Sequence, residues 1–285
     1  MLERRPLGKG WKLGYGGDTL NLAIHLARLG HDTAYFTALG TDGQSETLKA
    51  QWASEGLDIS LVLKHPVRGP GLYTISTDEY GERSFSYDRG KSAAREMFAL
   101  QETTRAITAA ARTDLLVFSL ISLAILPREG REALLALARG VRENGGRVAF
   151  DGNYRSRLWT NTNEAIHWRD AASGLADFGL PTFDDEASLS GEASAEAVAR
   201  HWQELGCGEV VVKLGAGGCR LPDGEICPPP IVLAPIDTSG AGDAFDAGYL
   251  SARLDGAEPE AAARAGHALA GWTIMRPGAI PPKDS

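Results

Sequence analysis

Segments with a helical pattern of apolar residues alternate along the chain with short apolar runs that are typical of strands. Several of the helical segments stop at glycine, which commonly follows the last turn of a helix. We expect helices at 21–29, 45–55, 128–144, 193–205, 242–254 and 259–275. We expect buried strands at 33–39, 115–118, 147–150, 177–180 and 209–214.

The stretch from about residue 57 to residue 90 has a different pattern, without the alternation of helices and strands. Short strands are expected at 61–63, 71–75 and 84–87, with turn residues between them. Residues 78–82 are typical of a hairpin turn. The pattern therefore predicts a small antiparallel sheet inserted into an α/β chain.

Strands that alternate with helices favour a doubly wound, mainly parallel sheet with helices on both faces. We find no linker, low-complexity tract or internal repeat, so residues 1–285 are expected to form a single domain. Ligands bind such sheets beyond the carboxyl ends of the strands. Asp151, Gly215 and the loop 238–242 are expected to lie there.

Composition places the chain among ordinary globular proteins. Hydrophobic residues are 43% and charged residues 23% of its 285 residues, which excludes an intrinsically disordered chain. A net charge of −8 argues against a nucleic-acid partner, although it leaves a small anionic substrate open. The longest apolar run, 115–126, is too short to span a bilayer.

The cysteine pattern and the first residues bear on the compartment. The chain has three cysteines, Cys207, Cys219 and Cys227, in spacings that match no zinc site. An odd number of cysteines without a metal pattern indicates free thiols in a reducing compartment. No apolar signal region follows Met1. We therefore expect a cytoplasmic protein without a membrane partner.

The sharpest local signal is the polar, glycine-containing segment from Asp237 to Phe245, which runs directly into an expected helix. Small residues at a helix N-terminus let backbone N–H groups converge on an anion, such as a phosphoryl group in transfer. Asp243 would then accept a proton from a substrate hydroxyl. In the alternative interpretation, Gly240 and Gly242 form a tight turn and Asp243 only caps the helix. The local sequence does not separate the two.

Two segments resemble the terminal signatures of the ribokinase-like (PfkB) carbohydrate kinases. The C-terminal one is Asp237–Asp243, and the N-terminal one is Gly16–Asn21 followed by Ala27–Gly30. Other segments resemble one branch of this family, the 2-keto-3-deoxygluconate kinases: 71–73, 81–83, 87–89, 121–126, 151–159, 184–186 and 211–218. The resemblance covers nearly the whole chain in the right order, so it is more specific than either signature alone.

The resemblance implies roles for individual residues. Asp243 would be the base that takes the proton of the sugar hydroxyl, and Gly240, Ala241 and Gly242 would form the anion hole. The residues implied to bind the sugar are Gly16, Gly17, Asp18, Asn21, Tyr73, Tyr87, Arg89 and Arg155. An arginine suits a sugar acid because its planar donor pair matches a carboxylate. Without the resemblance, Asp18 would be interpreted as a helix cap, and the arginines as surface residues.

The resemblance also implies a nucleotide site. The residues implied to contact ATP are Asn153, Arg155, Lys213, Gly215, Gly217, Gly218, Gly240, Gly242 and His267. Glu186 would contact Mg²⁺ indirectly, through water. The alternatives are an ordinary turn after a strand for 215–218, a packing residue for His267, and an acidic helix start at Glu186 that only offsets the helix dipole.

One departure from the family pattern concerns the N-terminus. The family usually begins with an interior strand well before the Gly16–Asn21 signature, whereas fifteen residues precede Gly16 here. Met1–Glu3 resembles the tail of that strand, so the first strand is truncated in this sequence. We expect a gap in the sheet unless the true start lies upstream or another segment fills the gap. Segments of about 2–15 and 57–90 are expected to form a lid over the sugar.

The resemblance implies an ATP-dependent kinase that phosphorylates 2-keto-3-deoxy-D-gluconate to its 6-phosphate, in an Entner–Doudoroff type of sugar-acid breakdown. It implies Mg²⁺ as a cofactor, leaves a monovalent cation open, and suggests a homodimer that pairs through the lid. The alternatives are another sugar kinase of this fold, for fructose or ribose, and a truncated sugar-binding protein without catalytic activity.

Overall fold

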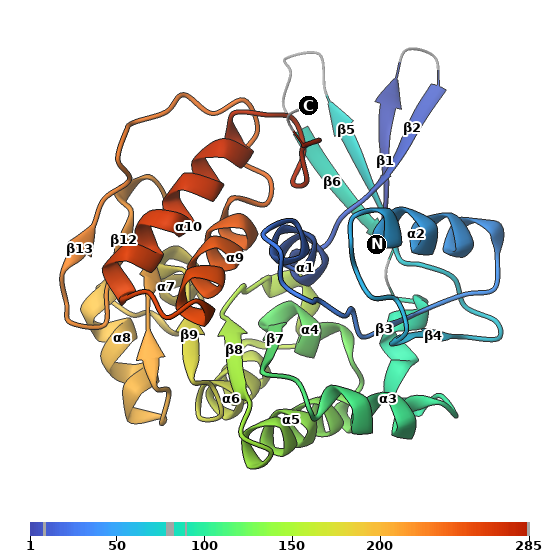
Figure 1. The fold of residues 1–285 in the computed structure, drawn as a ribbon, viewed down its shortest axis with the longest axis horizontal. Coiled ribbons are helices and arrows are strands. Elements are labelled where there is room, and N and C mark those ends of the chain that lie inside the picture. Colours follow the sequence, from blue (N-terminus) through green and yellow to red (C-terminus); the bar gives the residue numbers. More distant parts are fainter. Residues whose placement is uncertain (8–9, 78–82, 89, 284–285) are drawn as a thin grey trace.

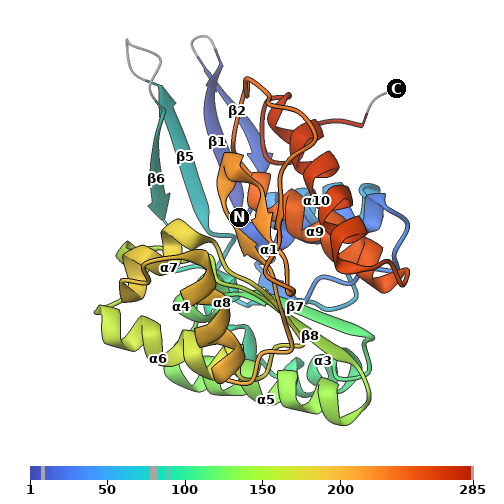
Figure 2. The same ribbon diagram turned by 90° about the vertical axis from the view of Figure 1, so that its left-hand side faces the viewer.

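The computed structural model describes residues 1–285 except 8–9, 78–82, 89 and 284–285. In this described part, four parallel strands form a central sheet in the order β10–β9–β8–β7. Their bounds are β7 (Leu115–Ser119), β8 (Arg147–Asp151), β9 (Phe178–Leu180) and β10 (Glu209–Val210). Helices cover both faces of this sheet, as Figures 1 and 2 show, so the predicted doubly wound α/β fold is confirmed.

The helices follow the predicted pattern closely. Their bounds are α1 (Asp18–Arg28), α2 (Gly43–Ser54), α3 (Thr103–Ala110), α4 (Leu120–Ile125), α5 (Arg128–Glu143), α6 (Thr162–Ser173), α7 (Phe183–Ser190), α8 (Ala195–Glu204), α9 (Ala241–Leu254) and α10 (Pro259–Ile274). Short 3-10 turns are η1 (Ala93–Ala99), η2 (Ser156–Leu158) and η3 (Gly215–Gly217). The six expected helices are α1, α2, α5, α8, α9 and α10, each with ends within three residues of the prediction.

Consecutive residues of β8 pack into two different hydrophobic clusters, because successive side chains of a strand point to opposite faces. Phe150 packs in the cluster that contains Leu134 of α5. Ala149 packs in the cluster that contains Phe245 and Tyr249 of α9. Since both faces are covered, β7 and β8 are continuous apolar runs without a polar alternation.

The predicted strand 209–214 is divided in two. Its first half is β10, which pairs with β9, and its second half is β11 (Val212–Lys213). β11 pairs with β12 (Cys219–Arg220), which in turn pairs with β13 (Ile226–Cys227), both antiparallel. A single parallel bridge from Thr182 to Lys213 keeps β11 in line with the central sheet.

A second sheet extends from the body in the order β2–β1–β5–β6 (Figures 1 and 2). Its strands are β1 (Leu2–Leu7), β2 (Gly10–Tyr15), β5 (Leu72–Thr77) and β6 (Arg83–Asp88). The pairs β1–β2 and β5–β6 are antiparallel, whereas β1 and β5 run parallel. We call this sheet the lid. The predicted hairpin turn 78–82 lies outside the described residues.

The strand expected at 61–63 does not join the lid, so that prediction is wrong. It is β4 (Val62–Lys64), which pairs in parallel with β3 (Thr37–Leu39). Leu63 and Ala38 are buried in the same apolar cluster, and this burial holds β4 against β3.

An apolar groove of about 740 Å³ separates β3 from β7. β7 lines it with residues 115–118, α1 with Leu22 and Leu26, and α5 with Leu134 and Leu137. Among the described residues, no strand pairs with the β7 edge that faces this groove. The groove lies where a gap in the sheet was expected, because residues 2–7 join the lid as β1 and no other described segment pairs with this edge of β7.

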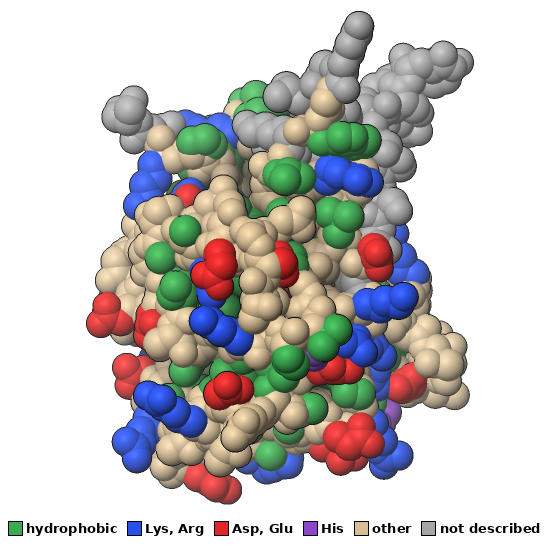
Figure 3. All heavy atoms as spheres, turned by 90° about the vertical axis from the view of Figure 1, so that its right-hand side faces the viewer, with side chains coloured by type: hydrophobic (Ala, Val, Ile, Leu, Met, Phe, Trp, Pro, Cys, Tyr) green, Lys and Arg blue, Asp and Glu red, His purple; other side chains and the backbone are tan. Residues whose placement is uncertain are grey.

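Neither the charges on the visible surface nor the described helices set one part of the molecule apart. Acidic and basic side chains are interspersed over the face that Figure 3 shows, so neither sign gathers into one patch there. None of the helices in the described part of the chain has both the length and the apolar character that crossing a membrane requires.

Candidate active site

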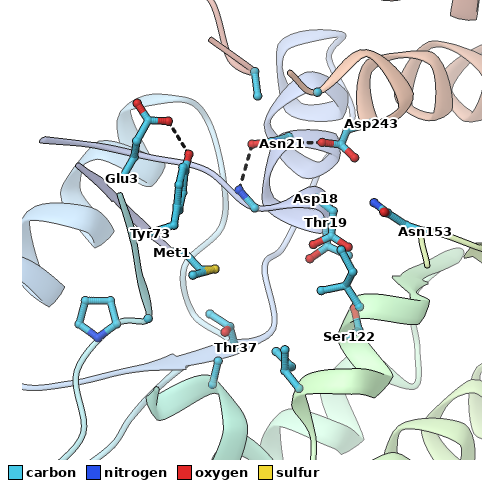
Figure 4. Close-up of a pocket in the computed structure, with 18 of the residues that line it drawn as sticks. Met1, Glu3, Asp18, Thr19, Asn21, Thr37, Tyr73, Ser122, Asn153 and Asp243 are labelled. Carbon is cyan, nitrogen blue, oxygen red and sulfur yellow. Dashed lines mark hydrogen bonds between the residues drawn. The ribbon is translucent and has the colours of Figure 1, made fainter. Parts of the chain in front are cut away.

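A cavity of about 560 Å³ lies at the carboxyl ends of β3, β7 and β8, between the lid and the loop that precedes α9 (Figure 4). Segments far apart in the sequence meet around it. Residues that the sequence analysis predicted and that line it are Gly17, Asp18, Asn21, Tyr73, Asn153, Arg155, Gly240 and Asp243. The fold therefore brings much of the predicted sugar site together with the predicted base.

Asp243 lies in the first turn of α9 and is 8% exposed. Its Oδ2 accepts a 2.7 Å hydrogen bond from Nδ2 of Asn21 (Figure 4). The backbone N–H of Gly17 donates to Oδ1 of Asn21 at 3.3 Å, which orients the amide so that its donor faces the carboxylate. The first turns of α1 and α9 are thus joined at the cavity wall.

The Asp243 carboxyl group has a strongly altered affinity for protons. Burial, the largest cause, raises the pKa of Asp243, as do the carboxylates of Asp18 and Asp151, and the net value is about 7. The hydrogen bond from Asn21 and the ammonium of Lys213 act in the opposite direction. A carboxyl group with a pKa near 7 can exchange a proton at neutral pH.

The turn before α9 requires glycine at position 240. The backbone φ angle of Gly240 is +74°, and a Cβ there would lie 2.6 Å from Cβ of Ala279. Asp237 stabilises the same turn, because its carboxylate accepts from the N–H of Ser239 at 3.1 Å and from that of Gly278 at 2.8 Å. The C-terminal segment therefore holds the turn in place.

The N-terminus of α9 is suited to bind an anion. No side chain caps the helix at Gly240, so its first N–H groups are not covered by a capping residue. Backbone N–H groups and the helix dipole together favour negative charge at this point. Ala241 and Gly242 belong to this turn, although neither residue lines the cavity.

Two further contacts hold carboxylates that line the cavity. The hydroxyl of Ser119, at the end of β7, donates to the carboxylate of Asp18. The hydroxyl of Tyr73 in the lid donates to the carboxylate of Glu3 (Figure 4). Gly16 does not line the cavity, but a Cβ there would lie 2.6 Å from the Tyr73 hydroxyl, so the glycine makes room for this contact.

Arg155 is the only arginine or lysine among the described residues that line the cavity. Its Nη1 lies 3.2 Å from both carboxylate oxygens of Asp185 and donates to the carbonyl of Tyr154 at 2.6 Å. Oδ1 of Asn153 is buried and has no hydrogen-bond partner in the described part of the chain. The two side chains offer a cation and an unused acceptor to a ligand.

Lys213 does not reach the cavity. Its Nζ lies 2.9 Å from Oδ1 of Asp151, and 2.9 Å and 2.8 Å from the two carboxylate oxygens of Asp246. Burial lowers the pKa of Lys213, but the two carboxylates outweigh burial and hold it above its usual value. The predicted contact of Lys213 with ATP stays a prediction.

The other residues predicted to contact ATP also lie away from the cavity. Gly215 and Gly217 form η3. A Cβ at Gly218 would lie 2.2 Å from the carbonyl oxygen of Cys227, so this glycine permits close packing against β13. Nε2 of His267 is 2.9 Å from that same oxygen, and burial lowers the pKa of His267. The His267 ring also packs against Phe245.

Glu186 faces the interior of the protein. It is fully buried and forms an ion pair with Arg169. Burial raises the pKa of Glu186 and Arg169 lowers it, and the net value is about 7. No group of three or more His, Cys, Asp or Glu side chains in the described part of the chain could hold a metal ion. These donors do not fit a resident metal, and the indirect contact of Glu186 with Mg²⁺ stays a prediction.

Two predicted sugar residues are not placed: the side chain of Tyr87 and the whole of Arg89 lie outside the described residues. Sequence reasoning missed Glu3, Ser119 and Asp246, each of which contacts a predicted site residue. Asp246 had a visible signal, because a carboxylate between the apolar residues Phe245 and Ala247 of a helix needs a partner when it is buried.

The sequence is similar to known proteins over nearly its whole length. The sequence pattern of the pfkB family carbohydrate kinases matches residues 3–285. A protein from Escherichia coli (strain K12) named 2-dehydro-3-deoxygluconokinase is 40% identical over 295 residues, which cover 100% of this chain and 96% of that protein. A protein of the same name from Haemophilus influenzae is 35% identical over 98% of this chain and 91% of its own length.

A solved structure with the same architecture carries ligands. The crystal structure of fructokinase from Vibrio cholerae O395, in its fructose, ADP and calcium ion bound form, matches with a TM-score of 0.84. The two sequences are 28% identical, and the match covers 98% of this chain and 91% of that chain.

Proposed function

The chain belongs to the pfkB family of carbohydrate kinases, and from this premise we propose that it phosphorylates 2-keto-3-deoxy-D-gluconate at the terminal hydroxyl, with ATP as the donor. Relatives at 35% to 40% identity carry the name of that activity. The observation that carries the proposal is the position of Asp243, a buried carboxylate on the cavity wall within the first turn of α9.

The proposed chemistry is a direct transfer. As the hydroxyl oxygen of the sugar attacks the γ-phosphorus of ATP, the Asp243 carboxylate takes its proton. The new bond joins the sugar oxygen to phosphorus, and the bond from phosphorus to the bridging β,γ-oxygen breaks, so ADP leaves. The N–H groups of the turn from Gly240 to Gly242 stabilise the charge on the transferring group.

The preference for a sugar acid is supported by Arg155. A planar guanidinium binds a carboxylate through two parallel hydrogen bonds, whereas a neutral sugar uses this geometry less. The described contacts of Arg155 with Asp185 and Tyr154 all use Nη1, so a substrate carboxylate can approach the remaining donors. Gly17, Asp18 and Asn21 are proposed to hold the sugar hydroxyls.

ATP is a substrate here, and Mg²⁺ would enter bound to its phosphates, since Mg²⁺ prefers phosphate and water oxygens. In the described part of the chain, the acidic side chains do not form a site that would hold the metal by itself. A requirement for a monovalent cation stays a prediction. A homodimer through the lid is also proposed, and the half-exposed side chains of Trp11 and Leu13 on β2 fit an apolar contact there.

A second candidate is a kinase for a neutral sugar. The cavity is lined by the carboxylates of Glu3, Asp18, Asp237 and Asp243 but by a single arginine, and carboxylates suit hydroxyl groups. The similarity to a fructokinase structure with bound fructose favours the same alternative. Substrate preference in solution separates the two candidates.

The test is a panel assay of ADP release with 2-keto-3-deoxygluconate, fructose and ribose. The proposal predicts the highest kcat/KM for the sugar acid. A preference for fructose or ribose would refute the sugar-acid assignment but keep the kinase. Sugar binding by calorimetry without ADP release from any sugar would favour a non-catalytic binding protein.

A further inference from the structure

Three buried charged side chains meet behind the first turn of α9. They are Lys213 of β11, Asp151 at the end of β8 and Asp246 of α9, which are 7%, 5% and 0% exposed. The Lys213 ammonium lies within 2.9 Å of one oxygen of Asp151 and of both oxygens of Asp246. A single cation thus links two strand ends to the helix that carries Asp243.

Lys213 has no donor left for a substrate phosphate. An ammonium group has three N–H donors, and three carboxylate oxygens lie within hydrogen-bond distance of this one. Lys213 also does not line the cavity. Its Nζ is nevertheless only 3.8 Å from the position that a Cβ at Gly242 would occupy. The charge therefore lies directly behind the turn without access to the ligand.

We propose that Lys213 is a positioning residue of the transfer site, which fixes the first turn of α9 through Asp151 and Asp246 and offsets the negative charge around Asp243. The inference rests on the proposed kinase function, because it concerns the base of that reaction. It assigns Lys213 a role through its neighbours in place of the nucleotide contact that the sequence suggested.

The charges around Asp243 support this role. Carboxylates face it or lie next to it from three elements: Asp18 of α1, Asp151 of β8 and Asp246 of α9. Lys213 of β11 is the cation with the largest effect on Asp243 among the described residues, and Asn21 is a neutral donor. Without Lys213, three carboxylates would oppose the ionisation of Asp243, and two of them would lose their shared partner.

The test compares two substitutions with opposite electrostatic effects. In Lys213→Met, the acidic limb of the kcat–pH profile is expected to shift to higher pH by about one unit or more, because the loss of a nearby positive charge raises the pKa of a carboxyl group. In Asp246→Asn, which keeps the shape but removes a negative charge, the limb is expected to move down. Lys213→Arg retains the charge and should restore most of the wild-type profile. KM for both substrates should change less than about twofold, because Lys213 touches neither.

A turnover-independent measurement separates this inference from the kinase proposal. The titration of the Asp243 carboxyl carbon, assigned by comparison with Asp243→Asn, can be followed by ¹³C NMR in each variant. Unchanged titration and an unchanged acidic limb in both substitutions, with only a lower Tm, would overturn the positioning role. If Lys213→Met does not fold, the direction in which the Asp243 titration shifts in Asp246→Asn decides whether the charge cluster acts on Asp243. A wild-type protein without kinase activity would refute the function, while the NMR titration would still decide the role of Lys213.

Discussion

The side-chain amide of Asn21 donates a 2.7 Å hydrogen bond to the carboxylate of Asp243, although 222 positions separate the two residues. This bond favours the charged form of Asp243, whereas burial and the carboxylate of Asp18 favour the neutral form. Burial prevails, and the pKa of Asp243 is raised to about 7. The first turns of α1 and α9 thus place a group that exchanges protons near neutral pH on the cavity wall.

Replacing Asp243 with Asn should remove turnover and leave sugar binding largely intact. The amide is similar in shape but cannot accept the proton, and general-base catalysis typically contributes about 10²- to 10⁴-fold. kcat from ADP release and sugar affinity from calorimetry measure the two effects. Asp255→Asn, at the exposed end of the same helix, is the control and should retain full activity. An Asp243→Asn variant with most of its kcat would rule out the assigned base.

The activity of the unmodified protein should depend on pH through Asp243. Its carboxyl must be ionised to accept a proton, and a raised pKa means that ionisation occurs only as the pH approaches about 7. kcat should therefore be half-maximal near pH 7, rise between about pH 6 and pH 8, and level off above that range. A pH profile at saturating substrate measures this. Constant kcat down to about pH 5 would contradict the raised pKa.

Replacing Arg155 with Ala should weaken the binding of the sugar acid more than the binding of ATP. The variant loses the only lysine or arginine side chain in the described cavity lining, and charge-assisted hydrogen bonds are worth about 1.5–3 kcal/mol each. We expect KM for the sugar acid to rise at least tenfold. The control is Arg157→Ala, an exposed neighbour that does not line the cavity. Equal effects of Arg155→Ala on both substrates would argue against a carboxylate contact.

Replacing Gly240 with Ala should damage the turn before α9. Alanine at this position would have to adopt a left-handed backbone conformation. Its Cβ would also lie 2.6 Å from Cβ of Ala279, which is too close. Gly256 is a matched control, because its φ angle is +86° but nothing lies within 4 Å of the added Cβ. Backbone strain alone costs about 1–2 kcal/mol, so Gly256→Ala should lower Tm slightly and keep kcat. Similar kcat in both variants would show that the turn geometry does not matter for transfer.

Joining an apolar strand of about five residues to Met1 should stabilise the protein, because the groove between β3 and β7 offers an open strand edge and apolar walls. The Met1 ammonium donates to the carbonyl of Gly16 at 2.8 Å, and a peptide N–H in its place can keep this bond. We expect Tm to rise by about 4 °C or more and the amides of β7 to exchange more slowly.

A same-length extension of alternating aspartate and glycine is the control for the groove. It can reach the groove but cannot cover apolar walls on both faces of a strand. The same Tm and the same amide exchange for the two extensions would show that the groove does not accept a strand.

Local patterns of residues determined most of the helices and the turn at the site. The apolar periodicity of segments such as 128–144 and 242–254 predicted α5 and α9 within a residue or two, because helix formation depends on neighbours three and four positions apart. The glycine spacing around Gly240 pointed to an anion-binding turn, since positive φ is a local property of the backbone. The resemblance to known kinases added the role of Asp243.

Only the tertiary structure decided which distant groups meet. Sequence spacing did not predict that Lys213 lies between Asp151 and Asp246, or that Glu186 is buried against Arg169. The strand at 62–64 pairs with β3 and not with the lid. Burial and charge pairing depend on which side chains the packed elements bring into contact. The spacing of residues along the sequence does not encode the distance in space between such side chains. The chain itself therefore specified most of its elements and the turn before α9, and packing determined the partners of each charged group.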